Sequence, residues 1–486
     1  MNDTLLSSFA EIIKIVDDKM WVPLAIFILA AGVYLSVRLL FVQIRKLPKA
    51  FRYLFSREKK GDGQISAFSA LCTALAATIG TGNIVGVATA ISLGGPGALF
   101  WMIVAAFFGM ATKYAECMLA VKYRTVDKDS HVLGGPFYYI QNGLKEVYGK
   151  NFKWLAVIFA VFGICVGLFG IGTFSQINSI TSAVANVTKD AYVIPDSIPV
   201  LGGHSIAVVV TGVLLTLLVG AVILGGFERI SAVASKVVPF MAIVYVLFCL
   251  IILFTNAAKL PQAIADIVIS AFQPQAIAGG VSGSLFVAMT NGTRRGIFSN
   301  EAGLGSAPMA AAQAQTAEPV RQGLVSMLGT FIDTIVICTM TGLAIVITGS
   351  WNVGLEGVNI TIHAFSEGLP GFLSAAAPYI LSVCLIFFAY TTILGWDLYS
   401  ESCLEYLVGR KRGVLLAFRW IYLLAVFIGP YMTISTVWTI ADIVNGLMAI
   451  PNLVGVLLLT GIVVKETKSY FDRLQDRRLK GRELRK

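Results

Sequence analysis

Glycine, hydroxyl and amide residues interrupt an apolar stretch of the chain in the sequence Ala77-Thr78-Ile79-Gly80-Thr81-Gly82-Asn83. Inside a lipid bilayer every backbone N–H and C=O group must be satisfied within the protein, so unwound backbone persists only where it lines a cavity or holds a ligand. Glycine lets a ligand approach that backbone closely, and carbonyl and hydroxyl oxygens are the ligands that a hard cation prefers. The interruption therefore predicts a binding site at membrane depth.

The chain as a whole has the composition of a polytopic membrane protein. Its 486 residues are 57% hydrophobic and 13% charged, and the mean hydropathy is +0.79, far above the range of soluble proteins. The net charge of +10 comes from Lys and Arg in short loops between apolar spans, which the topology rule of membrane proteins explains without nucleic acid. Seven cysteines without C-x-x-C spacing and three histidines offer little for a disulfide, a zinc site or a catalytic triad.

A membrane span needs roughly 20 apolar residues, and this rule predicts eleven spans in an all-α chain. They are 21–45, 65–92, 97–122, 153–186, 205–224, 236–256, 281–309, 321–349, 373–405, 413–429 and 433–464. Basic residues concentrate in alternate loops, most densely in residues 46–60, and in the tail. This asymmetry predicts a multi-pass protein of the plasma (inner) membrane, with its N-terminus outside and its C-terminus in the cytoplasm.

The predicted spans fall into two groups. Residues 1–20 are expected to form an amphipathic segment at the membrane surface, and residues 21–64 an extra transmembrane helix with a basic cytoplasmic loop. Five spans follow in 65–256 and five in 281–464, with an extracellular connection at 257–280 and a basic cytoplasmic tail at 465–486. The second group also opens with an expected interruption, Met289-Thr290-Asn291-Gly292-Thr293-Arg294-Arg295-Gly296, in a span of opposite direction. Two Gly-broken spans in inverted halves indicate a midplane substrate site in a secondary transporter.

Three stretches of the chain resemble the alanine or glycine:cation symporter family, over nearly its whole length. They are Gly80-Thr81-Gly82-Asn83-Ile84 with Gly94-Gly95-Pro96-Gly97-Ala98-Leu99-Phe100-Trp101-Met102, then Arg295-Gly296-Ile297-Phe298-Ser299-Asn300-Glu301-Ala302-Gly303-Leu304-Gly305-Ser306-Ala307-Pro308, and the shorter Thr391-Thr392-Ile393-Leu394-Gly395-Trp396. The resemblance implies a LeuT-type fold, a five-plus-five inverted repeat preceded by one extra helix. It also implies symport of sodium with a small neutral amino acid.

The resemblance implies a sodium site between the first and eighth core helices. Its oxygens would come from the carbonyls of Ala76, Ile79 and Phe388 and the hydroxyls of Thr391 and Thr392. The alternative is that adjacent threonines only bond back to the preceding turn of their helix.

The expected substrate residues are Thr78, Gly80, Thr81, Gly82, Asn83, Gln176, Phe286, Thr392 and Trp396. The amides of Thr81 and Gly82 would bind the carboxylate at a helix N-terminus. Asn83 would either join a second ion or brace the turn, and Gln176 would either meet the ligand or bond between helices. Trp396 would either cap a small side-chain pocket or anchor the protein at the membrane interface. An intracellular gate is expected at Arg294, Arg295 and Glu301 on the cytoplasmic side of the second interruption.

The resulting hypothesis is a carrier that couples inward sodium flow to uptake of alanine or glycine by alternating access. The second hypothesis is proton coupling, because Asp333, Asp397 and Asp442 lie inside predicted spans and intramembrane charges are usually functional. A membrane enzyme would need a paired nucleophile and base or a metal set. A channel would give broken helices in inverted halves no role in occlusion.

Overall fold

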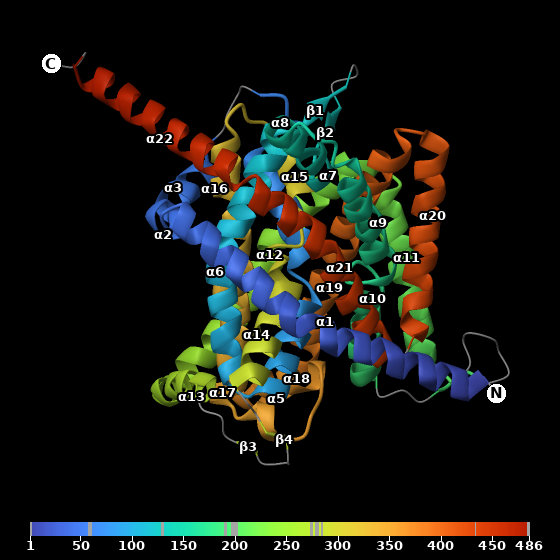
Figure 1. Ribbon diagram of the computed structural model, residues 1–486. Coiled ribbons are helices and arrows are strands. Elements are labelled where there is room, and N and C mark those ends of the chain that lie inside the picture. The colour runs from blue at the N-terminus through green and yellow to red at the C-terminus, as the bar shows by residue number, and fades with distance from the viewer. Residues whose placement is uncertain are drawn as a thin grey trace.

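The computed structural model describes residues 2–56, 61–127, 131–188, 192–195, 203–272, 276–277, 281–282, 285–432 and 434–483. The described chain is a helical bundle with two short antiparallel hairpins (Figure 1). Its first half contains α1 (Asn2–Arg38), α2 (Val42–Arg45), α3 (Leu47–Leu54), α4 (Ala67–Thr78), η1 (Thr81–Asn83), α5 (Val85–Gly94), α6 (Gly97–Lys122), β1 (Thr125–Val126), β2 (Val132–Leu133), α7 (Pro136–Tyr138), η2 (Tyr139–Gly143), α8 (Leu144–Tyr148), α9 (Lys153–Phe169), α10 (Phe174–Thr188), α11 (Ile206–Ile223) and α12 (Gly226–Thr255). Its second half contains η3 (Ala257–Lys259), α13 (Leu260–Phe272), β3 (Ala276–Ile277), β4 (Val281–Ser282), α14 (Leu285–Asn300), α15 (Ala307–Ala312), α16 (Pro319–Thr330), η4 (Phe331–Cys338), α17 (Thr339–Ile347), η5 (Ser350–Asn352), α18 (Val358–Gly368), α19 (Phe372–Val408), α20 (Arg412–Ile428), η6 (Gly429–Tyr431), α21 (Ile434–Leu458) and α22 (Thr460–Glu483).

Nine helical segments of the described chain are long and apolar enough to cross a membrane. They are Ile15–Arg38, Gly97–Lys122, Lys153–Ala185, Ile206–Ile223, Gly226–Thr255, Pro319–Ile347, Phe372–Val408, Arg412–Tyr431 and Trp438–Leu458. The other two predicted spans are the interrupted ones, which the structure divides into α4, η1 and α5 and into α14 and α15. A multi-pass membrane protein is thus confirmed.

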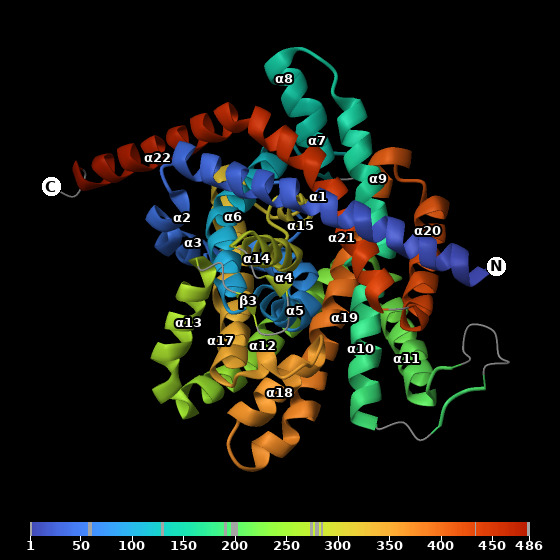
Figure 2. The ribbon, with the colours of Figure 1, turned by 60° about the horizontal axis from the view of Figure 1, so that its bottom comes forward.

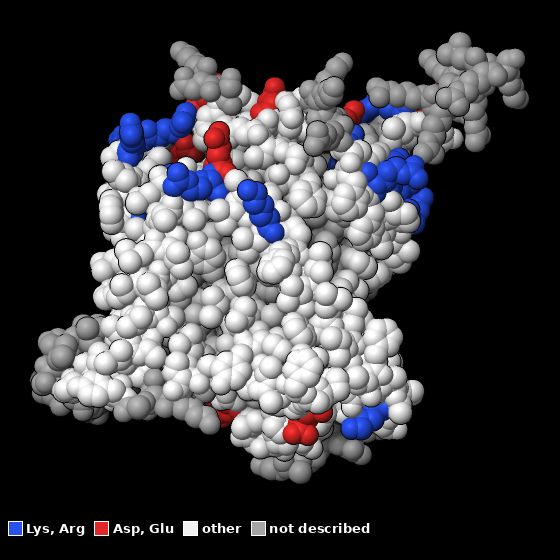
Figure 3. Space-filling view, turned by 180° about the vertical axis from the view of Figure 1, so that it is seen from behind, with Lys and Arg blue, Asp and Glu red and all other residues white. Residues whose placement is uncertain are grey.

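The two ends of the bundle differ in charge. We call the end that carries α8, the β1–β2 hairpin and α22 the basic end, because Lys and Arg side chains gather there (Figure 3). The opposite end carries α13, α18 and the β3–β4 hairpin. Five basic residues of the predicted loops, Arg57, Lys59, Lys60, Lys128 and Lys189, lie outside the described residues.

The interrupted segments lie at the centre of the bundle and run in opposite directions. Seen from the end that carries α13, the elements α4, α5 and α14 are surrounded by α6, α12, α17, α18, α19 and α21 (Figure 2). Along the chain α4 leads from the basic end to α5 at the opposite end, whereas α14 leads from the opposite end to α15 near the basic end (Figure 1). Both non-helical segments are therefore held away from the lipid.

The second interruption does not lie where the sequence pattern predicts it. Residues 289–296 are continuous helix within α14, and the backbone leaves the helix at 301–306, with positive φ at Glu301, Gly303 and Gly305. Gly292 and Gly296 have a different use, since a Cβ at either would contact α6, at Ala98 and Met102 respectively. These glycines permit close helix packing, and the break follows them.

Two further elements differ from the prediction. The expected surface segment 1–20 and the span 21–45 are one continuous helix, α1, which ends at Arg38. The single span predicted at 153–186 is divided into α9 and α10 by residues 170–173. A Cβ on Gly172 would lie 2.7 Å from the Cβ of Trp396, so glycine lets α19 approach this third break.

Candidate functional site

The first interruption was predicted at the right place, and its backbone is held by its own side chain. Helix α4 ends at Thr78 and α5 begins at Val85. The Gly80 N–H donates to the Oδ1 of Asn83 at 2.9 Å and not to the carbonyl four residues earlier. The carbonyl of Ala76 therefore loses its usual helical partner, which makes it available to an ion.

Oxygens of α19 meet the carbonyl at the end of α4. The Oγ1 of Thr392 donates to the Ile79 carbonyl at 3.3 Å and lies 3.0 Å from the Phe388 carbonyl. The Oγ1 of Thr391 lies 3.0 Å from the same Phe388 carbonyl. All these groups are buried. Four of the five residues expected at sodium thus lie together, and Ala76 is one turn before Ile79 on α4.

Only one of the two threonines links the helices. Thr392 bonds across to α4, while Thr391 bonds back to Phe387 and Phe388 and to the sulfur of Met241. Helices α4 and α19 come this close because Gly395 faces Ala77. A Cβ on Gly395 would lie 2.7 Å from the Cβ of Ala77. The structure therefore combines the expected ion ligands with the ordinary back-bonding of threonine.

The amide predicted to bind a carboxylate already has an acceptor. The Thr81 N–H donates to the Oε1 of Gln176 at 3.1 Å, and the Gln176 amide donates to the Ile171 carbonyl at 3.0 Å. The break between α9 and α10 brings Gln176 to this position. The side chain thus occupies an amide that a substrate carboxylate could take, so binding would require exchange of this hydrogen bond.

A polar cluster fixes the far side of the first break. Asn83 donates to the Asp333 carboxylate at 2.7 Å, and the hydroxyls of Ser299 and Thr334 donate to the same carboxylate at 2.8 and 2.7 Å. Asp333 lies in the π-helix η4, a widened turn of the kind often found at functional sites. Asn83 therefore braces the turn against α14 and η4. The sequence reasoning did not single out Ser299 or Thr334, although Ser299 lies within one of the recognised motifs.

The second unwound segment is anchored by Glu301. The Trp396 indole donates to its Oε1 at 2.9 Å, the Ser306 hydroxyl donates to its Oε2, and the Lys113 ammonium donates to its carbonyl at 3.0 Å. Trp396 is fully buried, so the interpretation as an interfacial anchor is wrong. Glu301 therefore ties α6 and α19 to the second break.

The predicted gate residues divide between two places. Arg294 and Arg295 lie in α14, between the second break and the end opposite the basic end, and both pair with Asp442. Glu301 lies within the break with the partners given above. The prediction placed both arginines between the second break and the basic end. In the structure the break follows them in the chain, so they lie on the other side of it, and the gate assignment is wrong for these two residues.

Two expected substrate residues have other surroundings. Phe286 lies at the start of α14 with 61% of its surface exposed, far along the helix from Ser299, so its assignment to the site is wrong. Thr78 is buried at the end of α4, where its hydroxyl bonds back to the Ala74 carbonyl at 3.2 Å. Gly82 lies against Ser299, and a Cβ on Gly82 would be 3.0 Å from the Ser299 Cα.

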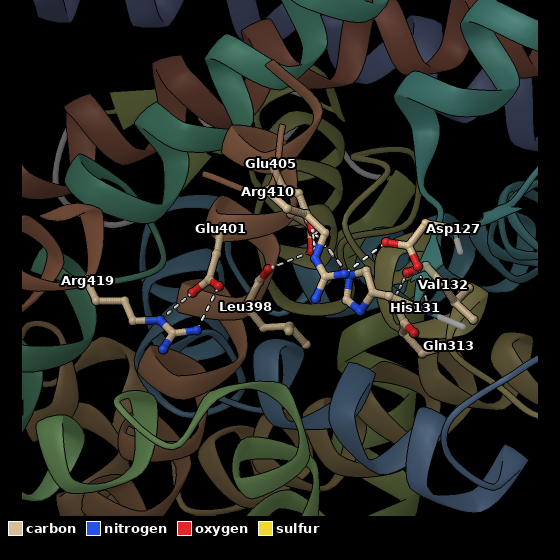
Figure 4. Close-up of polar contacts among 10 residues, drawn as sticks. Asp127, His131, Val132, Gln313, Leu398, Glu401, Glu405, Arg410 and Arg419 are labelled. Carbon is tan, nitrogen blue, oxygen red and sulfur yellow. Dashed lines mark hydrogen bonds and ion pairs between the residues drawn. The ribbon is translucent and has the colours of Figure 1, made fainter. Parts of the chain in front are cut away.

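Backbone bonds join the interrupted segments at the basic end. Ile65 precedes α4 and forms a parallel bridge with Ala314, which follows α15. The guanidinium of Arg124 donates to the carbonyls of Ala312, Ala314 and Thr316, each at 2.8 Å. Nearby, Figure 4 shows Arg410 beside Asp127 and Glu405, and His131 beside Glu405, so the β1–β2 hairpin is tied to the end of α19. Hydrogen bonds and ion pairs therefore join the described elements on the basic side of the breaks. The ion pairs of Arg294 and Arg295 with Asp442 join them on the opposite side.

These features define a class of protein. Interrupted spans of opposite direction, enclosed by a helical bundle, are the architecture of the LeuT-type fold. The solved structure of MhsT in complex with L-phenylalanine has this fold; it matches with a TM-score of 0.52 at 12% identity, over 85% of this chain and 99% of its own.

Comparison of the sequence gives the family. The model of the sodium:alanine symporter family matches residues 6–483, and the chain belongs to that family. It is similar to the sodium/alanine symporter AgcS of Methanococcus maripaludis, with 46% identity over 95% of this chain and 97% of the relative. It is also similar to the putative sodium/proton-dependent alanine carrier protein YrbD of Bacillus subtilis, with 36% identity over 95% of this chain and 92% of the relative.

Replacement of Gly80 tests the close packing of the first break. In Gly80→Ala the new Cβ would lie 2.5 Å from the Thr392 Oγ1 and 2.9 Å from the Gln176 Oε1, so both side chains must move. Overpacking of this kind costs about 1 to 3 kcal/mol, and we expect amino-acid uptake into proteoliposomes to fall about tenfold or more. Gly86→Ala is the matched control, since its Cβ would meet nothing within 4 Å. Equal uptake by the two variants would contradict the arrangement.

Proposed function

We propose that the protein is a symporter that couples the inward flow of Na⁺ to the uptake of a small neutral amino acid, alanine or glycine. Membership of the sodium:alanine symporter family supports cation-coupled amino-acid transport as the class of activity. The choice of ion and substrate rests on the site itself. The proposed cycle is alternating access, in which the bonds on the two sides of the breaks open in turn.

The observation that carries the proposal is the group of oxygens between α4 and α19. The carbonyls of Ile79 and Phe388 and the hydroxyls of Thr391 and Thr392 supply neutral oxygens without a carboxylate among them. Such a set suits a monovalent hard cation, because a divalent ion normally takes carboxylate ligands as well. Helix contacts between α4 and α19 would then depend on the bound ion, which couples ion binding to movement of the first interrupted segment.

The amino-acid site would lie beside this ion. Its carboxylate would bind the freed amides of Thr81 and Gly82, where the dipole of the following half-helix favours an anion. The Gln176 amide, which now accepts from Thr81, would turn to donate to the ligand. Close packing of Gly172 against Trp396 leaves little room for a long side chain, which supports a small substrate.

Removing the threonine hydroxyls should weaken the response to sodium. Loss of one such ligand costs about 1 to 3 kcal/mol, so Thr392→Ala should raise the half-saturating sodium concentration for alanine uptake about tenfold, and Thr391→Ala with Thr392→Ala further. Thr216→Ala is the control, since within the described structure that hydroxyl bonds back to Gly212 of its own helix α11 at 2.8 Å. An unchanged sodium curve in a well-expressed double variant would remove these residues from the site.

Proton coupling is the second candidate, and the observation that favours it is Asp397. This side chain is buried in α19, and within the described structure neither of its carboxylate oxygens has a hydrogen-bond partner. An unpaired buried carboxylate costs several kcal/mol as an anion, whereas Asp333 and Asp442 have partners. In the proteoliposome assay of the threonine variants, uptake driven by a proton gradient without sodium would favour this candidate. Uptake that requires a sodium gradient would favour the first.

Replacement of Trp396 tests the size of the substrate pocket. If the buried indole closes the pocket, Trp396→Ala should weaken inhibition of alanine uptake by glycine and serine and strengthen inhibition by valine and leucine. Each methylene accommodated in an apolar pocket is worth about 1 to 3 kcal/mol. Trp420→Ala is the control because that ring is 58% exposed on α20. An unaltered ranking of inhibitors at normal protein level would refute the capping role, and competition assays with labelled alanine decide it.

The proposed orientation places the basic end in the cytoplasm, with the N-terminus outside and the C-terminus inside. A cysteine at Glu146, which is exposed on α8, should react with an impermeant maleimide only after cells are permeabilised. A cysteine at Asp266, exposed on α13 at the opposite end, should react in intact cells. Labelling of the wild-type protein measures the background from its native cysteines. The reverse result would invert the orientation without changing the fold.

A further inference from the structure

Four charged side chains from three helices meet between the second break and the end of the bundle opposite the basic end. Arg294 of α14 lies between Asp442 of α21 and Asp17 of α1, and it forms an ion pair with each. Arg295 lies 3.1 Å from the Asp442 carboxylate. We call Asp17, Arg294, Arg295 and Asp442 the four-charge cluster. It joins α14, which leads into the second break, to α21 and to the extra N-terminal helix.

Aromatic rings and burial isolate this cluster from water. The side chains retain between 1% and 12% of their exposure. The Arg294 guanidinium lies 5.4 Å from the ring centroid of Trp21, and the Arg295 guanidinium lies 5.0 Å from that of Trp438. The Trp21 indole also donates to the Asp442 carbonyl at 3.3 Å. Charges in such surroundings are costly unless they balance.

The balance depends on α1. Among the described side chains, α14 supplies two positive charges and α21 supplies one negative charge, and the acidic groups that act on both arginines are Asp442 and Asp17. Without Asp17 the buried cluster would hold an uncompensated positive charge. The spans of the two groups of five therefore do not neutralise the four-charge cluster by themselves. The second negative charge comes from α1, which lies outside those groups.

We propose that Asp17 is a positioning residue of the transport cycle, which stabilises the closed state of this end by neutralising Arg294. When α14 and α21 separate, water reaches the arginines and the need for the second carboxylate disappears. Asp17 thus favours closure over opening, and α1 takes part in the gate. This inference rests on the proposed alternating access, but its physical content is a charge balance that can be measured without transport.

Exchange of backbone amides provides that measurement. In purified protein in nanodiscs, Asp17→Asn should increase deuterium exchange in peptides from residues 285–300 at least about tenfold, because breaking a buried pair is strongly destabilising. Peptides from residues 307–330, near the basic end, should keep their wild-type exchange. Asp266→Asn is the matched control, since it removes a carboxylate from exposed α13. Asp17→Glu should restore wild-type exchange.

The decisive variant combines Asp17→Asn with Arg294→Gln. It leaves one arginine and one aspartate, so the charge balance returns and exchange in 285–300 should fall back toward wild type. If Asp17 served only to fasten α1, the second substitution would not rescue, and exchange would also rise in 307–330. Either that result or unchanged exchange in Asp17→Asn would overturn the inference. Failure of sodium-driven uptake in the wild-type protein would instead contradict the proposed function and leave this measurement intact.

Discussion

The unwound backbone at residues 79–84 imposes the main constraint on this structure. It lies in the centre of an apolar bundle, where its freed amides and carbonyls cannot reach bulk water and must be satisfied by other groups. Asn83 bonds to the Gly80 amide, Gln176 to the Thr81 amide and Thr392 to the Ile79 carbonyl. Asn83 belongs to the break itself, whereas Gln176 comes from α10 and Thr392 from α19. The helices around the break are therefore fixed in position by the hydrogen bonds that the break demands.

Small residues make these bonds possible. Gly395 allows α19 to lie against α4, Gly172 allows the α9–α10 break to lie against Trp396, and Gly80 leaves room for both Thr392 and Gln176. A Cβ at any of these positions would lie 2.5 to 2.7 Å from an atom of its neighbour, which is closer than van der Waals contact allows, so that neighbour would have to move. Close packing by glycine and the polar contacts at the breaks are thus two aspects of one arrangement, since the second cannot form without the first.

Two kinds of contact lie on the two sides of the breaks. Backbone bonds and the Arg124 guanidinium join the segments on the basic side, whereas buried ion pairs between side chains join the other side. Buried ion pairs are strong only while water is excluded and their geometry is kept. A small movement of α14 relative to α21 would therefore replace the ion pairs by hydration, which suits a contact that must open and close.

The sequence by itself determined the class of protein, the first interruption and the group of oxygens that meet between α4 and α19, because these depend on local composition and on residues inside long, specific motifs. It also singled out Trp396 and Gln176, which the structure places in hydrogen bonds to the second and the first break. The position of the second break, the break in 153–186 and the partners of Arg294 were decided only by the tertiary structure. A glycine in an apolar helix can either unwind the backbone or admit a neighbouring helix, and Gly292 does the second because Ala98 packs against it. Likewise, Asp17 carries no mark in the sequence that pairs it with an arginine 277 residues away, since such a pairing exists only once α1 has packed beside α14 and α21.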